Sequence, residues 1–119
     1  MSQDIRITLR DKEFALVPTF EALERVEAAS NRSVFEILQD VAMSKPIKLA
    51  EIVSIIAYSA QTMGQMPDWW SRANVGAEVC KRGIREFYAP ATSWLVAACT
   101  PAPTAKVESS GAGDDEKKP

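Results

Sequence analysis

The chain opens on a stretch in which apolar and polar residues alternate. Residues 5–9 carry isoleucine or leucine at every second position with arginine and threonine between them, so one face of an extended segment is apolar. A polar turn over residues 10–13 leads into a second short run at residues 14–17, and Pro18 ends it because proline cannot donate a ladder hydrogen bond. This pattern predicts a two-stranded β-hairpin over residues 5–17 with one apolar face.

Helical periodicity replaces alternation after the hairpin. Thr19 is placed to cap the first amides of a helix whose inward residues are predicted to be Phe20, Leu23 and Val26. Further segments with apolar residues three and four positions apart follow this helix. The predicted helices cover about residues 19–29, 33–43, 49–61, 74–82 and 84–99.

Local signals indicate where these helices begin and end. Ser33 and Glu36 have the spacing of a capping box at the start of the second helix. Pro46 ends that helix, because the residue before a proline is driven out of helical geometry. Gly83 stands where a left-handed cap residue would separate the last two helices, and Pro90 is expected to kink or divide the final helix.

The third helix, at about residues 49–61, is apolar over more than half of its circumference, so we expect the others to pack around it. The sequence thus predicts an α+β, mostly helical fold, in which an N-terminal two-stranded β-hairpin packs on a bundle of about five short helices. Residues 1–99 are predicted to form a single folded domain. Residues 100–119 hold no aromatic residue and are predicted to be a disordered C-terminal tail.

Composition and charge narrow the function classes. The 119 residues are 46% hydrophobic and 25% charged, which is ordinary for a soluble globular protein. No apolar run is long enough to span a membrane and the N-terminus is charged, so we expect a cytoplasmic protein without a membrane partner. The net charge is only −2. Lys81, Arg82 and Arg85 stand at helical pairing distance from Glu78 and Glu86, which predicts a solvated, salt-bridged face rather than a nucleic-acid surface.

The residue types needed for catalysis or metal binding are missing or isolated. The chain has no histidine, and its glycines form no phosphate-binding loop. Cys80 and Cys99 each fall in a helical pattern and are predicted to be small core residues, the alternative being an exposed thiol. Glu21 and Glu24 lie beside Arg25 on a helix surface, where an exposed ion pair is expected. We therefore expect no enzymatic activity, no cofactor and no metal.

The segment from the hairpin into the first helix carries a family resemblance. It has Asp11 in the turn, and it continues as Phe14-Ala15-Leu16-Val17-Pro18-Thr19-Phe20-Glu21-Ala22-Leu23, with Val26-Glu27 following. This segment resembles the gene-transfer-agent and siphophage family of small tail proteins described as tail assembly chaperones. The order and spacing of the later helices agree with that family over about residues 5–99. Lys12 follows Asp11 where Asp-Gly is common in the family, so a longer turn is favoured over a tight mirror-image one.

The resemblance implies a chaperone that binds the long tape-measure protein and keeps it soluble while the tail tube is assembled. The tail tube protein and a second copy of this chain are further candidate partners. Such a chaperone needs exposed apolar surface, for which the free edges of the hairpin and two sets of side chains are candidates. The candidate partner-binding residues are Met63, Met66, Trp69 and Trp70 in a loop, and Phe87, Tyr88 and Trp94 in the last helix.

The loop over residues 62–70 allows two interpretations. Its large apolar side chains either fold back as a lid over the helical core or form an exposed adhesive patch, since tryptophan is favoured at the centres of interfaces. Two other functions also stay open. One is a structural tail component, such as a tube or connector subunit, and the other is a small helical regulatory protein that binds DNA or another regulator.

Overall fold

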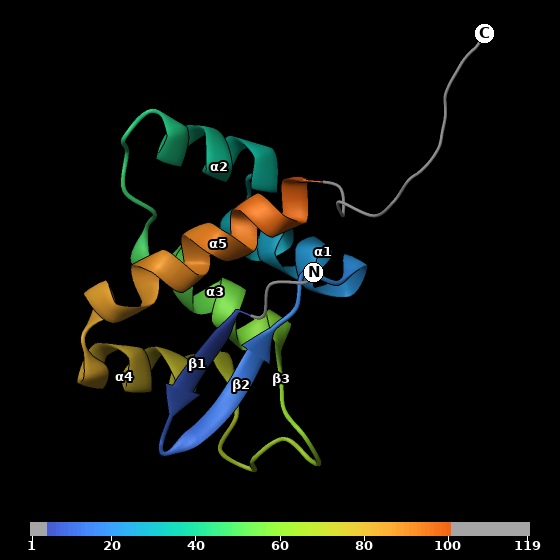
Figure 1. The fold of residues 1–119 in the computed structure, drawn as a ribbon, viewed down its shortest axis with the longest axis vertical. Coiled ribbons are helices and arrows are strands. Elements are labelled where there is room, and N and C mark those ends of the chain that lie inside the picture. Colours follow the sequence, from blue (N-terminus) through green and yellow to red (C-terminus); the bar gives the residue numbers. More distant parts are fainter. Residues whose placement is uncertain (1–4, 101–119) are drawn as a thin grey trace, which may run out of the picture.

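The computed structural model describes residues 5–100 of the chain. The fold is α+β and mostly helical, as predicted, with a small antiparallel sheet at the N-terminus and helices after it (Figure 1). The predicted tail, residues 101–119, lies outside the described residues. The elements are β1 (Arg6–Leu9), β2 (Lys12–Leu16), α1 (Phe20–Ser30), α2 (Val34–Ala42), α3 (Leu49–Ser59), β3 (Ala60–Gln61), α4 (Arg72–Arg82), the 3₁₀ helix η1 (Ile84–Phe87) and α5 (Tyr88–Cys99).

The turn between β1 and β2 is tighter than the sequence predicts. Leu9 pairs with Lys12, so only Arg10 and Asp11 lie in the loop, and both have positive φ angles, 51° and 62°. This is the geometry of a mirror-image, type I′ turn, which usually contains glycine. The expectation of a longer turn is wrong, and the reason lies outside the hairpin: Arg10 donates a 2.7 Å hydrogen bond from Nε to Glu78 on α4, which helps to hold the turn in this conformation.

The sheet has a third strand that periodicity did not predict. The helix expected to reach residue 61 ends at Ser59, and Ala60–Gln61 turns into an extended segment antiparallel to β2. The amide of Val17 donates to the carbonyl of Ser59 at 3.0 Å, which joins the end of β2 to the end of α3. The hairpin is therefore covered on its β2 edge. The two-stranded hairpin becomes a three-stranded sheet in the order β1-β2-β3.

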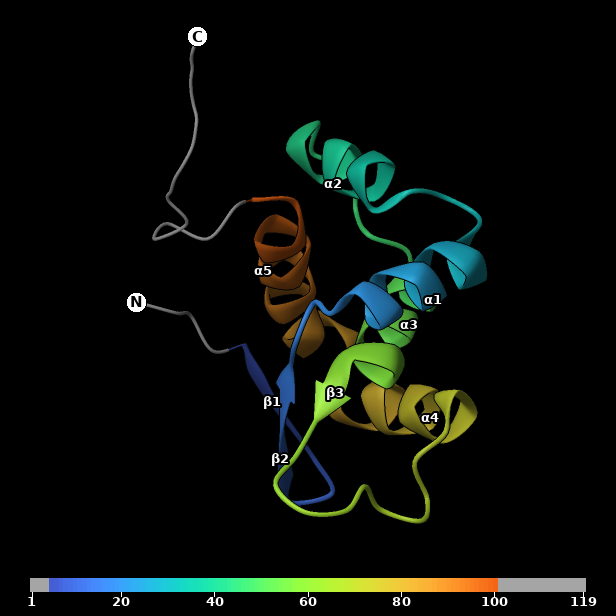
Figure 2. The ribbon, with the colours of Figure 1, turned by 90° about the vertical axis from the view of Figure 1, so that its right-hand side faces the viewer.

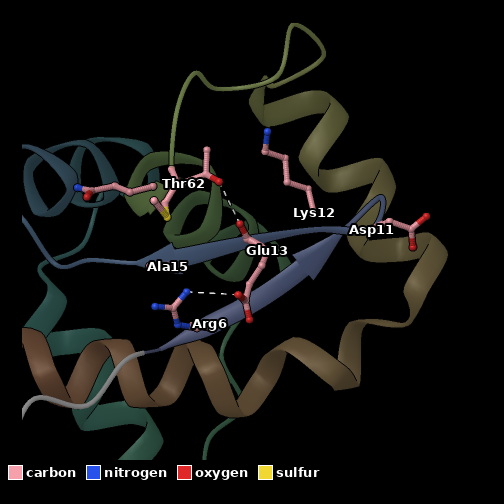
Figure 3. A pocket seen from close by; sticks show the side chains of 8 residues that line it. Arg6, Asp11, Lys12, Glu13, Ala15 and Thr62 are labelled. Atoms are coloured by element: carbon pink, nitrogen blue, oxygen red, sulfur yellow. Dashed lines mark hydrogen bonds and ion pairs between the residues drawn. The ribbon is translucent and has the colours of Figure 1, made fainter.

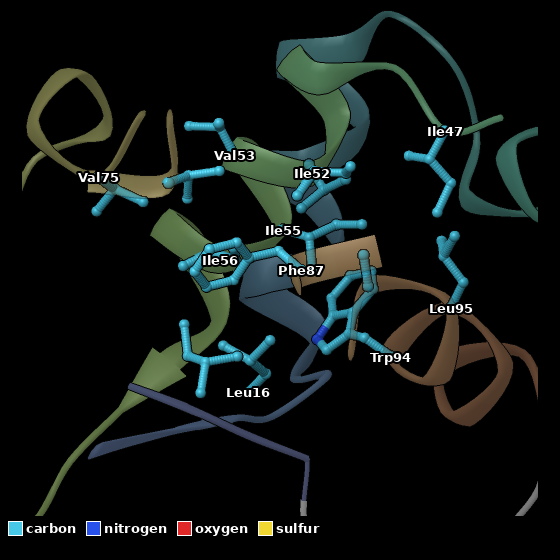
Figure 4. Close-up of a cluster of buried hydrophobic side chains, with 14 of the residues drawn as sticks. Leu16, Ile47, Ile52, Val53, Ile55, Ile56, Val75, Phe87, Trp94 and Leu95 are labelled. Carbon is cyan, nitrogen blue, oxygen red and sulfur yellow. The ribbon is translucent and has the colours of Figure 1, made fainter. Parts of the chain in front are cut away.

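Helix α3 is central, as its wide apolar surface predicts. It packs against α1, α4, α5 and β2 (Figure 2). Its residues at 51–56 are all buried, and side chains from the sheet and from α5 meet them in one core (Figure 4). Among the largest fully buried side chains are Trp94, Phe14, Phe87, Leu9, Ile37, Ile52, Ile55, Ile56 and Leu95.

Helix α1 buries Val26 and packs Leu23 against the core, as predicted, but it does not bury Phe20. Phe20 was expected to point inward, but it is 76% exposed, and the buried residues of α1 are Ala22 and Val26. Because Ala22 has a small side chain, it permits a close approach of α1 to α3, with which α1 has its most extensive contact. The predicted cap is present: Thr19 Oγ1 accepts a 3.1 Å hydrogen bond from the amide of Ala22.

The remaining helix boundaries agree with the local signals in most cases. The capping box of α2 forms, with Ser33 Oγ accepting from the amide of Glu36 at 3.1 Å and the Glu36 carboxylate accepting from the amide of Ser33 at 2.8 Å. Helix α4 starts earlier than predicted, because Ser71 caps it. The segment after Gly83 is divided at Tyr88, and Pro90 lies in the first turn of α5, where a missing amide costs little.

Arg32, in the connection between α1 and α2, links α2 to α3. Its guanidinium donates to the carboxylates of Asp40 on α2 and of Glu51 on α3, the latter at 3.0 Å, and to the carbonyl of Glu36 at 3.2 Å. The Glu51 side chain is only 4% exposed and also accepts from the amide of Lys48 at 3.2 Å. The hydrogen bond to Asp40, aided by the charge of Glu51, raises the pKa of Arg32 above its ordinary value. A buried carboxylate is thus fully paired at the junction of α2 and α3.

Candidate functional site

The loop over residues 62–70, here called the tryptophan loop, folds back onto the sheet and α3. The rings of Phe14 and Trp70 lie 4.6 Å apart between centroids, and those of Trp69 and Trp70 lie 5.3 Å apart. Trp70 Nε1 donates a 3.1 Å hydrogen bond to the carbonyl of Ala57 on α3. Trp69, Trp70 and Met66 are half-buried and pack against the core. Of the two interpretations left open by the sequence, the geometry of these three residues matches the lid.

A cation–π contact fastens this lid to the hairpin turn. The guanidinium carbon of Arg10 lies 4.6 Å from the centroid of the Trp69 ring, a cation–π contact, while Arg10 Nε donates to Glu78. The Glu78 side chain is 6% exposed, so it is not part of a solvated face as predicted. The hydrogen bond from Arg10 lowers the pKa of Glu78 against the opposing effect of burial, and Lys81 at 3.8 Å adds to the lowering.

Met63 is the large apolar side chain of the tryptophan loop that does not pack against the core. It is 94% exposed and borders a shallow hollow of about 540 Å³ on the outer face of the sheet. Figure 3 shows Arg6, Glu13 and Ala15 on that face with Thr62 beside them, and Thr62 Oγ1 donates to the carbonyl of Glu13 at 3.1 Å. Most of the residues that line the hollow are polar. Met63 is the one large, exposed apolar side chain among them.

The three aromatic residues predicted as a binding face are divided by the fold. Phe87 is 1% exposed and Trp94 is 0% exposed, so both belong to the core and neither can contact a partner in this conformation. Trp94 is buried because α5 lies against α2 and α3, and Phe87 is buried because it ends η1, which packs against α4 and α5. Within residues 5–100 the Nε1 atom of Trp94 has no hydrogen-bond acceptor. Tyr88 remains half-buried and reaches the surface.

Tyr88 lines a groove that the sequence did not reveal. The apolar groove, as we name it, has a volume of about 560 Å³ and is lined from the α2–α3 connection, α3, η1 and the start of α5. The α2–α3 connection passes the start of α5 in Figure 1. Its lining is formed by Pro46, Ile47, Ile52, Ile84, Arg85, Tyr88 and Ala89. The residues come from three separated segments, and no local pattern predicts that they meet. The only available signal was the apolar dipeptide at Pro46–Ile47 inside a polar connection.

Other large apolar side chains are exposed on the helices. Phe35 and Met43, at the two ends of α2, are 66% and 64% exposed. With Phe20 on α1 and Met63 in the tryptophan loop, they place large apolar groups in water at several points of a well-packed domain. A single exposed apolar side chain is ordinary, but aromatic and methionine side chains with this much exposure are suited to contact a partner.

No group of three or more His, Cys, Asp or Glu side chains within residues 5–100 is placed to hold a metal ion. Cys80 is exposed and not in the core as predicted, and Cys99 is half-buried. Burial raises the pKa of the Cys99 thiol, and the charge of Glu27 adds to the rise. The expected exposed pair is present, with Arg25 and Glu21 2.9 Å apart.

No helix among the described residues is long and apolar enough to cross a membrane. Comparison with protein-family models, with curated proteins and with solved structures finds no match to this chain. The resemblance to the tail assembly chaperones over about residues 5–99 therefore stays a prediction from the sequence.

Proposed function

We propose that this protein is a tail assembly chaperone of a phage-like element, which binds the tape-measure protein and keeps it soluble until the tail tube forms around it. The observation that carries the proposal is the exposure of Phe20. This residue stands in the segment that bears the family resemblance, yet it is 76% exposed and contributes nothing to the core. An aromatic side chain in that position serves a contact outside the domain.

The rest of the surface supports a binding role of this kind. Phe35 and Met63 add large exposed apolar groups, and the apolar groove adds a concave site. A long helical partner with repeated apolar faces needs a binder that meets many similar segments, for which aromatic and methionine side chains are well suited. The core residues Phe87 and Trp94 hold the scaffold, and the exposed residues contact the partner.

Co-expression with the tape-measure protein encoded nearby tests the proposal. We expect the long partner to be soluble and to be retained with the affinity-tagged chain, and Phe20→Ser to reduce the retained amount. Glu24→Ser on the same helix is the matched control, since Glu24 is also exposed and its loss removes no apolar contact. Equal retention by both variants would remove Phe20 from the binding surface, and an insoluble partner in every case would refute the function.

The protein content of finished particles separates the chaperone from the structural alternative. A chaperone is absent from purified particles or scarce in them, whereas a tube or connector subunit is present at a fixed ratio to the tail. Mass spectrometry of purified particles gives that ratio directly. A stoichiometric amount of this chain in finished tails would favour the structural role.

A further inference from the structure

The apolar groove is lined mostly by apolar residues. Of its lining residues, Ile47 and Ile52 are 6% and 1% exposed and belong to the buried core that Figure 4 shows, whereas Ile84 is 41% exposed. Leu49 lies one helical turn before Ile52 on α3 and is also 41% exposed, so it extends the apolar surface beyond the groove. The volume of about 560 Å³ lies within the range of ligand pockets. The occupant must therefore present apolar side chains.

The backbone around the groove favours a helical occupant. Every lining residue belongs to a helix or to the α2–α3 connection, and no strand of the sheet contributes to it. An extended peptide gains its affinity from main-chain hydrogen bonds to a strand edge, which this groove does not offer. A helix satisfies its own backbone and needs only apolar anchors at positions i, i+3 or i+4, and i+7.

The rim of the groove is positively charged. Arg85 is among the lining residues, and Lys45 and Lys48 flank the lining residues at 46–47. All three are exposed, and none of them takes part in an ion pair within the described part of the chain. The nearest acidic residues in sequence are engaged elsewhere, since Glu86 pairs with Arg82 and Glu51 pairs with Arg32. One exposed cation thus lines the apolar site and two more are next in sequence to its lining residues, on a chain whose net charge is −2.

We propose that the apolar groove binds an acidic amphipathic helix of a partner protein. The apolar face of that helix contacts Ile84 and Tyr88, and Glu or Asp residues on its flanks pair with Arg85, Lys45 and Lys48. Charges act over about 8 Å at physiological ionic strength, so the local rim governs the choice of partner although the whole chain is acidic. The inference rests on the proposed function in one respect, because both require a helical apolar partner.

Two synthetic peptides test this assignment with the full-length chain. Both carry leucine at the i, i+3, i+4 and i+7 positions, and one has glutamate while the other has lysine at every polar position. Binding is measured by fluorescence anisotropy of a labelled peptide. We expect the glutamate peptide to bind and the lysine peptide to bind roughly tenfold more weakly, because each exposed charge pair adds a small factor.

Three exposed substitutions locate the site on the chain. Ile84→Asp should weaken binding of the glutamate peptide, and Lys45→Glu should weaken it while improving binding of the lysine peptide. Lys12→Glu is the matched control, since Lys12 is exposed in the hairpin and the change in net charge is the same. Thermal unfolding by circular dichroism identifies any variant that fails to fold, and in that case Arg85→Glu replaces Lys45→Glu.

Each outcome decides between the alternatives. Equal affinity for both peptides, or equal effects of Lys45→Glu and Lys12→Glu, would overturn the assignment. Concentration-dependent dimerisation that Ile84→Asp abolishes would instead make a second copy of the chain the occupant. If the peptides fail while the tape-measure protein is still kept soluble, the groove is wrong and the function stands. If the peptides bind as expected but the tape-measure protein stays insoluble, the groove is right and the proposed function is wrong.

Discussion

Replacing Arg32 by methionine isolates the energetic role of the buried ion pair between α2 and α3. The substitution keeps an unbranched apolar side chain of similar length but removes the hydrogen bonds to Asp40, Glu51 and the carbonyl of Glu36. The Glu51 side chain, which is 4% exposed, is then left with the amide of Lys48 as its hydrogen-bond donor among the described residues. The variant therefore contains a buried carboxylate without its counter-charge.

The cost follows from burial. Leaving one charge of a buried pair unpaired costs about 3–5 kcal/mol, whereas the Asp40 side chain is 32% exposed and recovers part of its solvation. Because Arg32 itself is 23% exposed and water can partly reach the site, we expect the lower value, about 3 kcal/mol. A loss of that size lowers the melting temperature by roughly 15 °C in a domain of this length.

Urea unfolding followed by circular dichroism measures this loss, and two further variants sharpen the result. Arg25→Met removes the exposed pair with Glu21, whose side chains are 59% and 72% exposed, and should cost less than about 0.5 kcal/mol. The double variant Arg32→Met with Glu51→Gln should cost about 1 kcal/mol less than the sum of its parts, because the buried charge is gone. An effect of Arg32→Met no larger than that of Arg25→Met would refute the reasoning.

Three further predictions address other parts of the domain. Because hydrogen bonding to Arg10 lowers the folded-state pKa of Glu78 below the ordinary value of 4.5, the stability that it contributes is complete above that pH and is lost as the pH falls through the folded-state pKa. The free energy of unfolding in urea, measured from about pH 6 down to about pH 3, should therefore fall less for Glu78→Gln than for the natural chain. Asp11→Gly should stabilise the type I′ turn by roughly 0.5 kcal/mol and Lys12→Gly should destabilise β2 by about as much, so the opposite order would contradict the two-residue turn. Trp94→Ala should cost about 3–5 kcal/mol in the same assay, whereas Met63→Ala should change stability by less than about 0.5 kcal/mol, and similar costs for both would contradict the burial.

Local signals in the sequence are sufficient for most of the secondary structure. Thr19, Ser33 and Glu36 cap helices as predicted, because a cap is made by residues three positions apart and needs nothing from the rest of the fold. The central position of α3 also follows from its own composition. The α+β fold class could therefore be predicted from patterns within single segments.

Contacts between distant residues decided the features that the sequence did not reveal. Arg10 and Glu78 are 68 positions apart, and their pairing helps to hold the tight turn and pairs a buried carboxylate that was predicted to lie on a solvated face. The orientation of α1 depends on how closely Ala22 approaches α3, so helical periodicity alone placed Phe20 on the wrong side. The exposed residues and the apolar groove depend on how the helices pack, which no single segment of the sequence specifies.

The measurement that tests the central claim most directly is the aggregation of the purified tape-measure protein, followed by light scattering as denaturant is diluted away. The account predicts that the purified full-length chain suppresses the rise in scattering, and that Phe20→Ser suppresses it less well at equal concentration. Scattering that rises equally with and without the chain would contradict the proposal that this domain is a chaperone for that partner.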